Sequence, residues 1–164
     1  MVSLGLGADV VRRRQDAPMQ TASDLAYLTG ALAAFRRRQT RSLDLGIDGQ
    51  GPVTVKATML CVSNGQYAGG GMRFAPNGCV TDGLLDVVAL DMTALTAAVG
   101  IAVSLYAGDV GARPHVQQFV GREISVDGEP LALEVDGEWA GCSPARFEVL
   151  PRALAVMFPR VDDG

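Results

Sequence analysis

Histidine and cysteine are scarce in this sequence, and this scarcity limits the chemistry that the chain can perform. It has one histidine, His115, and three cysteines at wide spacings with no C-x-x-C pair, namely Cys61, Cys79 and Cys142. The pattern argues against a structural zinc site and against a disulfide framework. No Ser-His-Asp order and no H-E-x-x-H motif occurs, so hydrolase chemistry has no support in the sequence. We interpret His115, which follows a proline and has no partner pattern, as structural.

Long hydrophobic runs are also missing. The longest apolar window, Met92 to Gly108, has 17 residues and is interrupted by two threonines, a serine and a glycine. Because a membrane-spanning helix needs about 20 apolar residues, this window predicts a buried helix instead. The first residues contain glycines, an aspartate and then three arginines, and they lack the apolar stretch of a secretory signal. We therefore expect a cytoplasmic protein with reduced thiols.

Apolar residues are nevertheless abundant enough for one folded core. The chain has 164 residues, of which 48% are hydrophobic and 20% are charged, so residues 1–164 are expected to form a single domain. The net charge of -4 is unevenly distributed, because residues 1–41 hold seven arginines and only three aspartates while the remainder is acidic. Such asymmetry is typical either of a segment that meets an anionic partner or of a solvated helix face.

Three segments are predicted to contain helix. Residues 2–14 suggest a short strand, a glycine turn and the start of a helix. Between Asp24 and Arg41, leucine and phenylalanine recur at spacings of three and four, which is the helical period. A further helix is predicted for residues 92–106, with Asp91 as its N-terminal cap and Gly108 at its end.

The remaining sequence has the texture of β-structure. Residues 42–47 and 53–62 flank an Asp-Gly-Gln-Gly turn and predict a hairpin, and residues 86–90 predict another strand. The tetrapeptide Val-Asp-Gly-Glu occurs at 126–129 and again at 135–138, which suggests two adjacent hairpin turns. The last third is expected to be a meander with strands at residues 123–126, 131–135, 147–150 and 153–158. The predicted fold is mainly β with about two helices, an α+β architecture.

A glycine-rich segment, Asn64 to Met72, is the first candidate for chemistry. It holds four glycines within seven residues, and three of them are consecutive, Gly69, Gly70 and Gly71. Glycine permits positive φ and close backbone approach, so the segment suits either a phosphate cradle or the turn of a bulged strand. It matches neither the Walker A loop nor the G-x-G-x-x-G fingerprint.

Three carboxylates beside glycine turns are further candidates. Asp82 precedes Gly83, and its carboxylate together with backbone carbonyls would form an oxygen ligand set for Mg²⁺ or Ca²⁺, with turn capping as the simpler explanation. Glu129 and Glu138 each follow an Asp-Gly turn at the end of an apolar run. A carboxylate on such a rigid turn can act as general base for a hydroxyl, or it can be an exposed hairpin acid.

Three motifs in sequence order resemble one protein family. The segments NGQYAGGGMRFAPNGCVTDGLLDVVAL (64–90), LEVDGEWAG (133–141) and PARFEVLPRALAVMFP (144–159) are similar to the C-terminal domain of the bacterial diacylglycerol kinase and sphingosine kinase family of lipid kinases. The segments SLGLGADVVRR and DLAYLTGALAAF also resemble the start of that domain. The resemblance covers essentially the whole chain and implies a β-sandwich related to that of NAD kinases. The family's N-terminal domain carries a GGDGT nucleotide motif, which this sequence lacks, so the resemblance is to the second half only.

The resemblance also implies roles for individual residues. The family's catalytic glutamate, which accepts the proton of the lipid hydroxyl, falls on Glu138, whereas Glu129 shares only the Asp-Gly-Glu triplet. The family's structural magnesium site falls on the Asp82 carboxylate and the Leu84 carbonyl, with a further ligand at Cys79. Because Mg²⁺ disfavours thiolate, Cys79 would contribute its carbonyl oxygen. The loop that faces the substrate would comprise Asn64, Gly69, Gly70 and Gly71, and Glu138 is expected to share a cavity with it.

The implied reaction is phosphoryl transfer from ATP to a diacylglycerol-like hydroxyl, with Mg²⁺ as cofactor and ATP bound mainly by the other half. The chain alone is then expected to be inactive. Its implied partners are the lipid, the inner membrane surface, the ATP-binding domain and a second copy of itself, but not nucleic acid. Arg12–Arg14 and Arg36–Arg38 would face anionic headgroups. Two alternatives stay open: a non-catalytic lipid-binding or regulatory remnant, and a dinucleotide-binding sandwich like that of NAD kinases.

Overall fold

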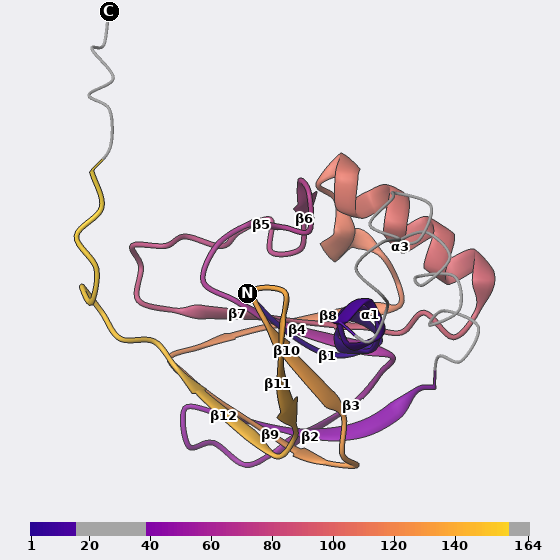
Figure 1. Cartoon of the computed structure of the whole chain (residues 1–164), viewed down its shortest axis with the longest axis horizontal. Coiled ribbons are helices and arrows are strands. Elements are labelled where there is room, and N and C mark those ends of the chain that lie inside the picture. Colours follow the sequence, from indigo (N-terminus) through magenta and orange to yellow (C-terminus); the bar gives the residue numbers. More distant parts are fainter. Residues whose placement is uncertain (16–38, 158–164) are drawn as a thin grey trace, which may run out of the picture.

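The computed structural model describes residues 1–15 and 39–157, and it consists mostly of antiparallel strands with two helices (Figure 1). This confirms the predicted fold class. One sheet has six strands, in the spatial order β11 (Glu138–Cys142), β10 (Ala132–Val135), β1 (Val2–Gly5), β4 (Met59–Ser63), β7 (Leu85–Leu90) and β8 (Val116–Gly121). The other sheet has four strands, in the order β12 (Ala145–Glu148), β9 (Glu123–Gly128), β2 (Arg41–Ile47) and β3 (Val53–Ala57). The remaining elements are the ribbon of β5 (Tyr67–Ala68) and β6 (Met72–Arg73), the helices α1 (Leu6–Gln15) and α3 (Leu95–Ala107), and the 3-10 turn η2 (Val110–Ala112).

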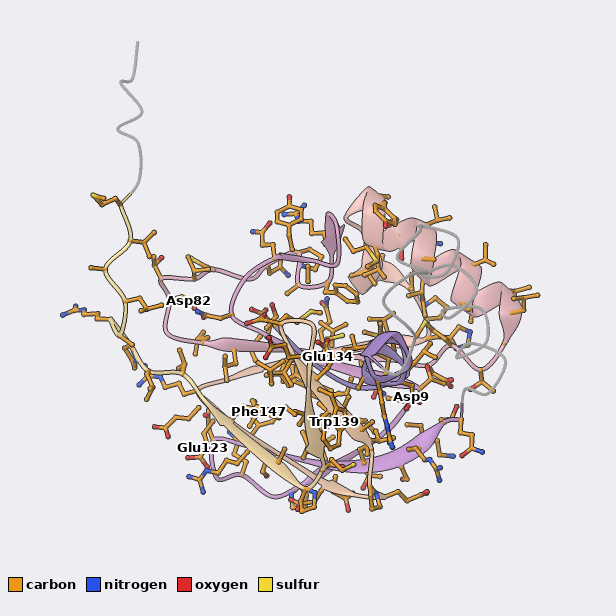
Figure 2. All side chains as sticks on the ribbon, in the orientation of Figure 1. Asp9, Asp82, Glu123, Glu134, Trp139 and Phe147 are labelled. Carbon is orange, nitrogen blue, oxygen red and sulfur yellow. The ribbon has the colours of Figure 1, made fainter. Side chains whose placement is uncertain are left out.

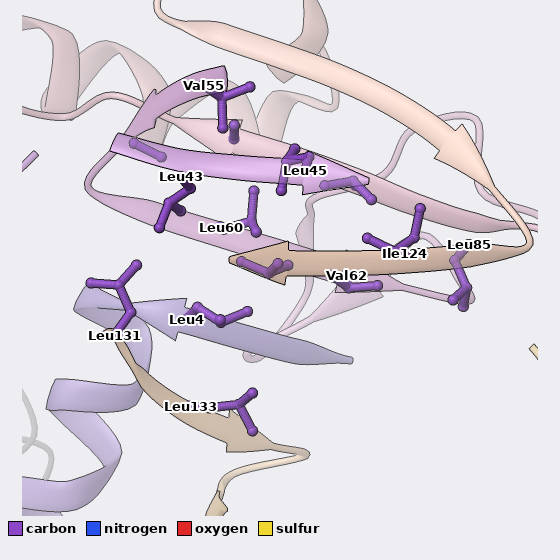
Figure 3. Close-up of a cluster of buried hydrophobic side chains, with 14 residues drawn as sticks. Leu4, Leu43, Leu45, Val55, Leu60, Val62, Leu85, Ile124, Leu131 and Leu133 are labelled. Carbon is purple, nitrogen blue, oxygen red and sulfur yellow. The ribbon is translucent and has the colours of Figure 1, made fainter. Parts of the chain in front are cut away.

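The main core lies between the two sheets (Figure 3). It forms because alternate residues of each strand point inward: Leu43 and Leu45 of β2 are fully buried, while Ser42, the residue before Leu43, is exposed. From the six-stranded sheet, Leu4 and Leu60 meet them from the opposite side. Each fully buried leucine of this kind stabilises the fold by about 1.5–3 kcal/mol relative to an exposed one.

A second core covers the outer face of the six-stranded sheet. Cys61 and Val88 point to this face, where Ile101 and Leu105 of α3 pack against them. The central strands β4 and β7 are therefore buried on both faces, which explains why they are continuous apolar runs and do not alternate. Helix α1 covers the same face of the sheet over β1, β10 and β11.

The predicted strand at residues 53–62 is two strands in different sheets. β3 pairs with β2 in the predicted hairpin, and β4 pairs with β1 and β7 in the other sheet. The chain crosses between the sheets at Thr58, whose backbone N–H and hydroxyl both donate to the Leu90 carbonyl at 2.9 Å. A single prediction over both strands was wrong because threonine in a β-rich run carries no local sign of such a crossing.

Helix α3 differs from its prediction in two respects. It begins at Leu95, not at Met92, because the Asp91 carboxylate accepts hydrogen bonds from the Thr93 N–H at 3.1 Å and the Thr40 hydroxyl at 3.2 Å and does not cap the helix. Only one face is buried, and the other exposes four large apolar side chains, Leu95, Val99, Val103 and Tyr106. The predicted end is confirmed, since Gly108 has φ 82. No helix within residues 1–15 and 39–157 is long and apolar enough to cross a membrane.

The structure differs from the sequence-based predictions at several other strands and turns. Residues 153–157 form no strand, and strands β8 and β11 were not predicted. The first Val-Asp-Gly-Glu copy ends β9, and the chain then passes to the other sheet, so only the second copy is a hairpin turn. The helix predicted for residues 24–41 lies outside the described residues, except that Gln39 and Thr40 are not helical and Arg41 begins β2.

Candidate functional site

One end of the six-stranded sheet collects the segments that carry the predicted site residues. Val135, Val2, Val62 and Val87 form one row across β10, β1, β4 and β7. Just beyond this row lie the turn before Glu138, the segment that starts at Asn64, and the loop of Asp82 to Leu84. The first and last of these are three strand spacings apart, which corresponds to about 14 Å. The sheet thus brings the three segments to one edge and spreads them along it.

Glu138 lies directly after a two-residue hairpin turn formed by Asp136 and Gly137. Both turn residues have positive φ, 47 and 88, as a tight hairpin between twisted strands requires. Glu138 pairs with Val135 across the hairpin, and both side chains therefore leave the sheet on the face toward the four-stranded sheet. The Glu138 side chain is exposed, and no described residue forms a hydrogen bond or ion pair with its carboxylate.

The glycine-rich segment is the ribbon β5–β6, and its three consecutive glycines form the turn. Gly69, Gly70 and Gly71 have φ values of 56, 79 and 100. Residues other than glycine adopt this backbone conformation only with strain. Arg73 of β6 links the ribbon to the segments on either side of it, because its guanidinium donates to Gln66 Oε1 at 3.0 Å and to the Pro76 carbonyl at 2.9 Å. Figure 1 shows the ribbon beside α3. The turn of a short ribbon is thus the role that the geometry gives these glycines, and Asn64 before them is exposed.

The three predicted magnesium ligands lie in the loop before β7, where hydrogen bonds connect Asp82 to both Leu84 and Cys79. The Asp82 carboxylate accepts the Leu84 N–H at 2.9 Å, and the Cys79 carbonyl accepts the Asp82 N–H at 3.3 Å. The Cys79 thiol turns to the Thr81 hydroxyl at 3.2 Å. Figure 2 shows Asp82 on this peripheral loop. The residues fit a hard cation only through oxygen, namely one carboxylate and two carbonyls.

A second carboxylate lies near this loop and was missed by sequence reasoning. Partial burial, and after it the charge of Asp82, raises the pKa of the Asp86 carboxyl above its ordinary value. Within the part of the chain that the structure describes, no three histidine, cysteine, aspartate or glutamate side chains come close enough to hold a metal. Any cation at Asp82 would therefore depend on backbone carbonyls.

A cleft of about 160 Å³ lies at the opposite end of the sandwich. Its lining includes Arg41 and residues from two parts of the six-stranded sheet's end, namely Gly5, Leu6, Thr58, Pro130, Leu131 and Ala132. The cleft contains none of the predicted site residues. Glu129, the alternative glutamate, lies beside it and forms an ion pair with Arg41. The structure thus separates the two glutamates: Glu129 is held by a cation and Glu138 is not.

Comparison with known proteins assigns the fold to one class, the β-sandwich halves of lipid kinases. A family model described as the YegS C-terminal NAD kinase beta sandwich-like domain matches residues 1–158, and the chain belongs to this family. It is 32% identical over 168 residues to a probable lipid kinase YegS-like of Pseudomonas putida, an alignment that covers 97% of this chain and 52% of the relative. It is 25% identical over 136 residues to a diacylglycerol kinase of Mycobacterium tuberculosis, covering 83% of this chain and 44% of the relative.

Solved structures share the same architecture. A crystal structure assigned as a diacylglycerol kinase of Bacillus anthracis superimposes with a TM-score of 0.63 at 22% identity, covering 92% of this chain and 48% of that one. A second structure of a diacylglycerol kinase from the same organism gives a TM-score of 0.51 at 19% identity, covering 73% and 43%. At these identities the likeness establishes the fold. The chain spans about half the length of the relatives that it matches.

Proposed function

We propose that this chain is the C-terminal part of an ATP-dependent lipid kinase, which phosphorylates a diacylglycerol-like hydroxyl together with an ATP-binding half. The observation that carries the proposal is the hairpin at residues 135–138 of a lipid kinase family domain. It presents a carboxylate without a partner among the described residues, at the sheet end that also holds the Asp82 loop. The relatives named as lipid and diacylglycerol kinases support the substrate class.

In this proposal Glu138 accepts the proton of the lipid hydroxyl as the hydroxyl oxygen bonds to the terminal phosphorus of ATP; the bond from that phosphorus to the bridging oxygen breaks, and ADP leaves with its electron pair. The exposure of Glu138 fits the role, because a base that must meet a large substrate between two halves lies open in one half alone. A positioned general base of this kind contributes about 10²- to 10⁴-fold to the rate. Electrostatic stabilisation and positioning of the phosphates would fall to the other half.

The Asp82 loop would hold a divalent cation through the Asp82 carboxylate and the Cys79 and Leu84 carbonyls. Such an ion would supply positive charge that stabilises the Asp82 loop and favours nearby phosphate groups. The chain's own residues prepare this arrangement, since the Asp82 carboxylate is already fixed by the Leu84 N–H at 2.9 Å. The proposal keeps Mg²⁺ because the family resemblance implies it, and the oxygen ligands suit Mg²⁺ as they would suit Ca²⁺.

The C-terminal arm, residues 150–157, is a candidate contact surface for the ATP-binding half. It leaves the sandwich after β12 and extends into solvent (Figure 1), with Leu154 83% and Met157 98% exposed. An extended apolar segment with few contacts is the kind of surface that a second protein surface covers. We assign this arm to contact with the ATP-binding half.

The side of the molecule that the helices cover has features that suit peripheral binding to the inner surface of the membrane. Both helices cover the same side of the six-stranded sheet, where α3 exposes Leu95, Val99 and Val103 and α1 exposes Arg12. Exposed apolar and basic side chains on the same side of a protein suit contact with an anionic lipid surface. Membrane binding is measured by cosedimentation with vesicles of varied anionic lipid content. Replacing Val99 and Val103 by glutamate should abolish vesicle binding, and wild-type binding by that variant would refute this part of the proposal.

The proposed reaction is tested with a reconstituted kinase, defined here as this chain joined to the half of the P. putida relative that it does not match. Labelled ATP and diacylglycerol in detergent micelles are the substrates, and each half alone is the control. We expect label in the lipid only when both halves are present, with loss of activity in the Glu138→Gln variant. A folded, associated pair without transfer would favour the non-catalytic remnant, and full activity of Glu138→Gln would refute the proposed base.

A further inference from the structure

Glu134 of β10 is the only charged side chain among the buried residues of the described structure (Figure 2). It is 6% exposed and lies on the outer face of the six-stranded sheet, under α1. No described lysine or arginine forms an ion pair with it. Burial of an unpaired carboxylate is costly, so its presence at this position calls for a compensating role.

Two hydrogen bonds hold both oxygens of this carboxylate. The Ser3 hydroxyl donates to Oε1 at 2.7 Å, and the Gly137 N–H donates to Oε2 at 2.7 Å. Ser3 is itself fully buried on the neighbouring strand, directly opposite Glu134. Helix α1 closes over the pair, because a Cβ atom at Gly7 would lie only 2.3 Å from the Ser3 hydroxyl oxygen. The carboxylate thus has one fixed position.

The Gly137 N–H is the point at which this arrangement reaches the hairpin turn. A two-residue Asp-Gly turn closes through backbone hydrogen bonds of its own, so the turn does not need a buried carboxylate in order to form. The bond from Gly137 instead fixes the orientation of the Asp136–Gly137 peptide, the central peptide of the turn that leads into Glu138. The position of Glu138 relative to the sheet is therefore set from the buried side of β10.

The first Val-Asp-Gly-Glu copy provides an internal contrast. The residue before it is Ser125, whereas the residue before the second copy is Glu134. Glu129 at the end of the first copy is fixed directly by Arg41. Glu138 has no such direct partner among the described residues. The buried carboxylate that precedes its motif holds the turn through Gly137, and Met1 holds it through Asp136.

We propose that Glu134 is a positioning residue for Glu138. Through Gly137 it holds the turn so that the Glu138 carboxylate meets the lipid hydroxyl, and Ser3 holds Glu134 in turn. This inference rests on the proposed function, since it assigns Glu138 a proton to accept. It extends the site to a serine on a different strand, 131 residues away in sequence.

The test compares Glu134→Met, Glu134→Gln and Ser3→Ala in the reconstituted kinase, with Ser125→Ala as the matched control at the other copy. Methionine keeps the volume and removes both acceptors, and misplacement of a reacting group by about 1 Å costs on the order of 10²-fold. We therefore expect Glu134→Met to lower kcat by about 10- to 100-fold with KM for ATP within about twofold. Glutamine should restore kcat to within about threefold, because its oxygen accepts the Gly137 N–H while its amide donates to Ser3.

The outcomes separate this inference from the proposed function. Full activity of Glu138→Gln would refute the proposed base itself. An inactive Glu138→Gln together with a folded Glu134→Met of unchanged kcat would overturn the positioning role alone. Where Glu134→Met does not fold, Ser3→Ala decides, because it removes one hydrogen bond and leaves the carboxylate in place. A fall in its kcat with unchanged KM supports the proposal, and a wild-type kcat overturns it.

Discussion

The same four residues, Val-Asp-Gly-Glu, occur at 126–129 and at 135–138, and the two copies have different structures. The first completes strand β9 in the four-stranded sheet, next to β2. The second is the hairpin between β10 and β11 in the six-stranded sheet. Pro130 follows the first copy and cannot donate to a ladder, whereas Trp139 follows the second and continues β11.

Every position of the tetrapeptide is used differently in the two copies. Val126 is fully buried and Val135 is 38% exposed. Gly128 approaches the backbone of β2, and Gly137 faces open space. Glu129 pairs with Arg41, while Glu138 is unpaired among the described residues. Tertiary contacts, not the local sequence, therefore decide which glutamate is held in a structural ion pair and which is left available for chemistry. Exchanging equivalent residues tests this contrast position by position.

The glycine pair should show the largest difference in stability. Gly128 has φ 110, and a Cβ atom there would lie 2.8 Å from the Ser42 carbonyl oxygen. Because backbone strain and a clash with backbone act together, Gly128→Ala should lower the free energy of unfolding by about 3 kcal/mol. At Gly137, with φ 88 and no atom near, the same change should lower it by only about 1 kcal/mol. Urea denaturation of both variants measures the difference, and equal losses would contradict the account.

The valine pair should come next. Val126 belongs to the core between the sheets, so Val126→Ala removes two methyl groups from a closed space. The expected loss is about 2 kcal/mol, against less than about 0.5 kcal/mol for the partly exposed Val135. Differential scanning calorimetry should give a clearly lower midpoint for Val126→Ala alone. A similar fall for Val135→Ala would mean that the second copy is packed as tightly as the first.

The glutamate pair should show the smallest effect on stability. Glu129 is 52% exposed and its ion pair with Arg41 lies at the surface. Exposed ion pairs contribute about 0–1 kcal/mol, so Glu129→Gln and Glu138→Gln should both unfold within about 0.5 kcal/mol of the wild type. Denaturation in low and high salt checks this. A salt-sensitive loss confined to Glu129→Gln remains consistent with the pair, whereas a large loss in Glu138→Gln would indicate a structural partner for that carboxylate.

Much of the fold follows from local patterns. The doubly buried strand β7 was predicted from its apolar run, and the end of α3 from Gly108. The edge strand β11 was missed because Glu138 to Cys142 is short, exposed and without alternation. The crossing at Thr58 was missed because it depends on the distant Leu90 carbonyl. In the second failure the deciding contact is remote in sequence, and in the first the local pattern is too weak to mark a strand.

The candidate site divides in the same way. Glu138, Asp82, Leu84 and Cys79 were assigned through resemblance to a family, and their roles remain predictions. The sequence did not predict a role for Glu134, because a glutamate within LALEV is indistinguishable from an exposed strand residue. Its burial results from Ser3, which β1 places opposite it, and from α1 above both. Such a contact between strands β1 and β10, whose two residues are 131 positions apart, has no local signature.

The most direct test of the account is the rate of phosphate transfer to lipid by the reconstituted kinase with Glu138→Gln and, separately, Glu129→Gln. A general base contributes about 10²- to 10⁴-fold, so Glu138→Gln should lose at least about 100-fold in kcat while Glu129→Gln stays within about twofold of the wild type. Equal rates for the two variants, or a greater loss in Glu129→Gln, would contradict the assignment of the proton acceptor to the hairpin copy.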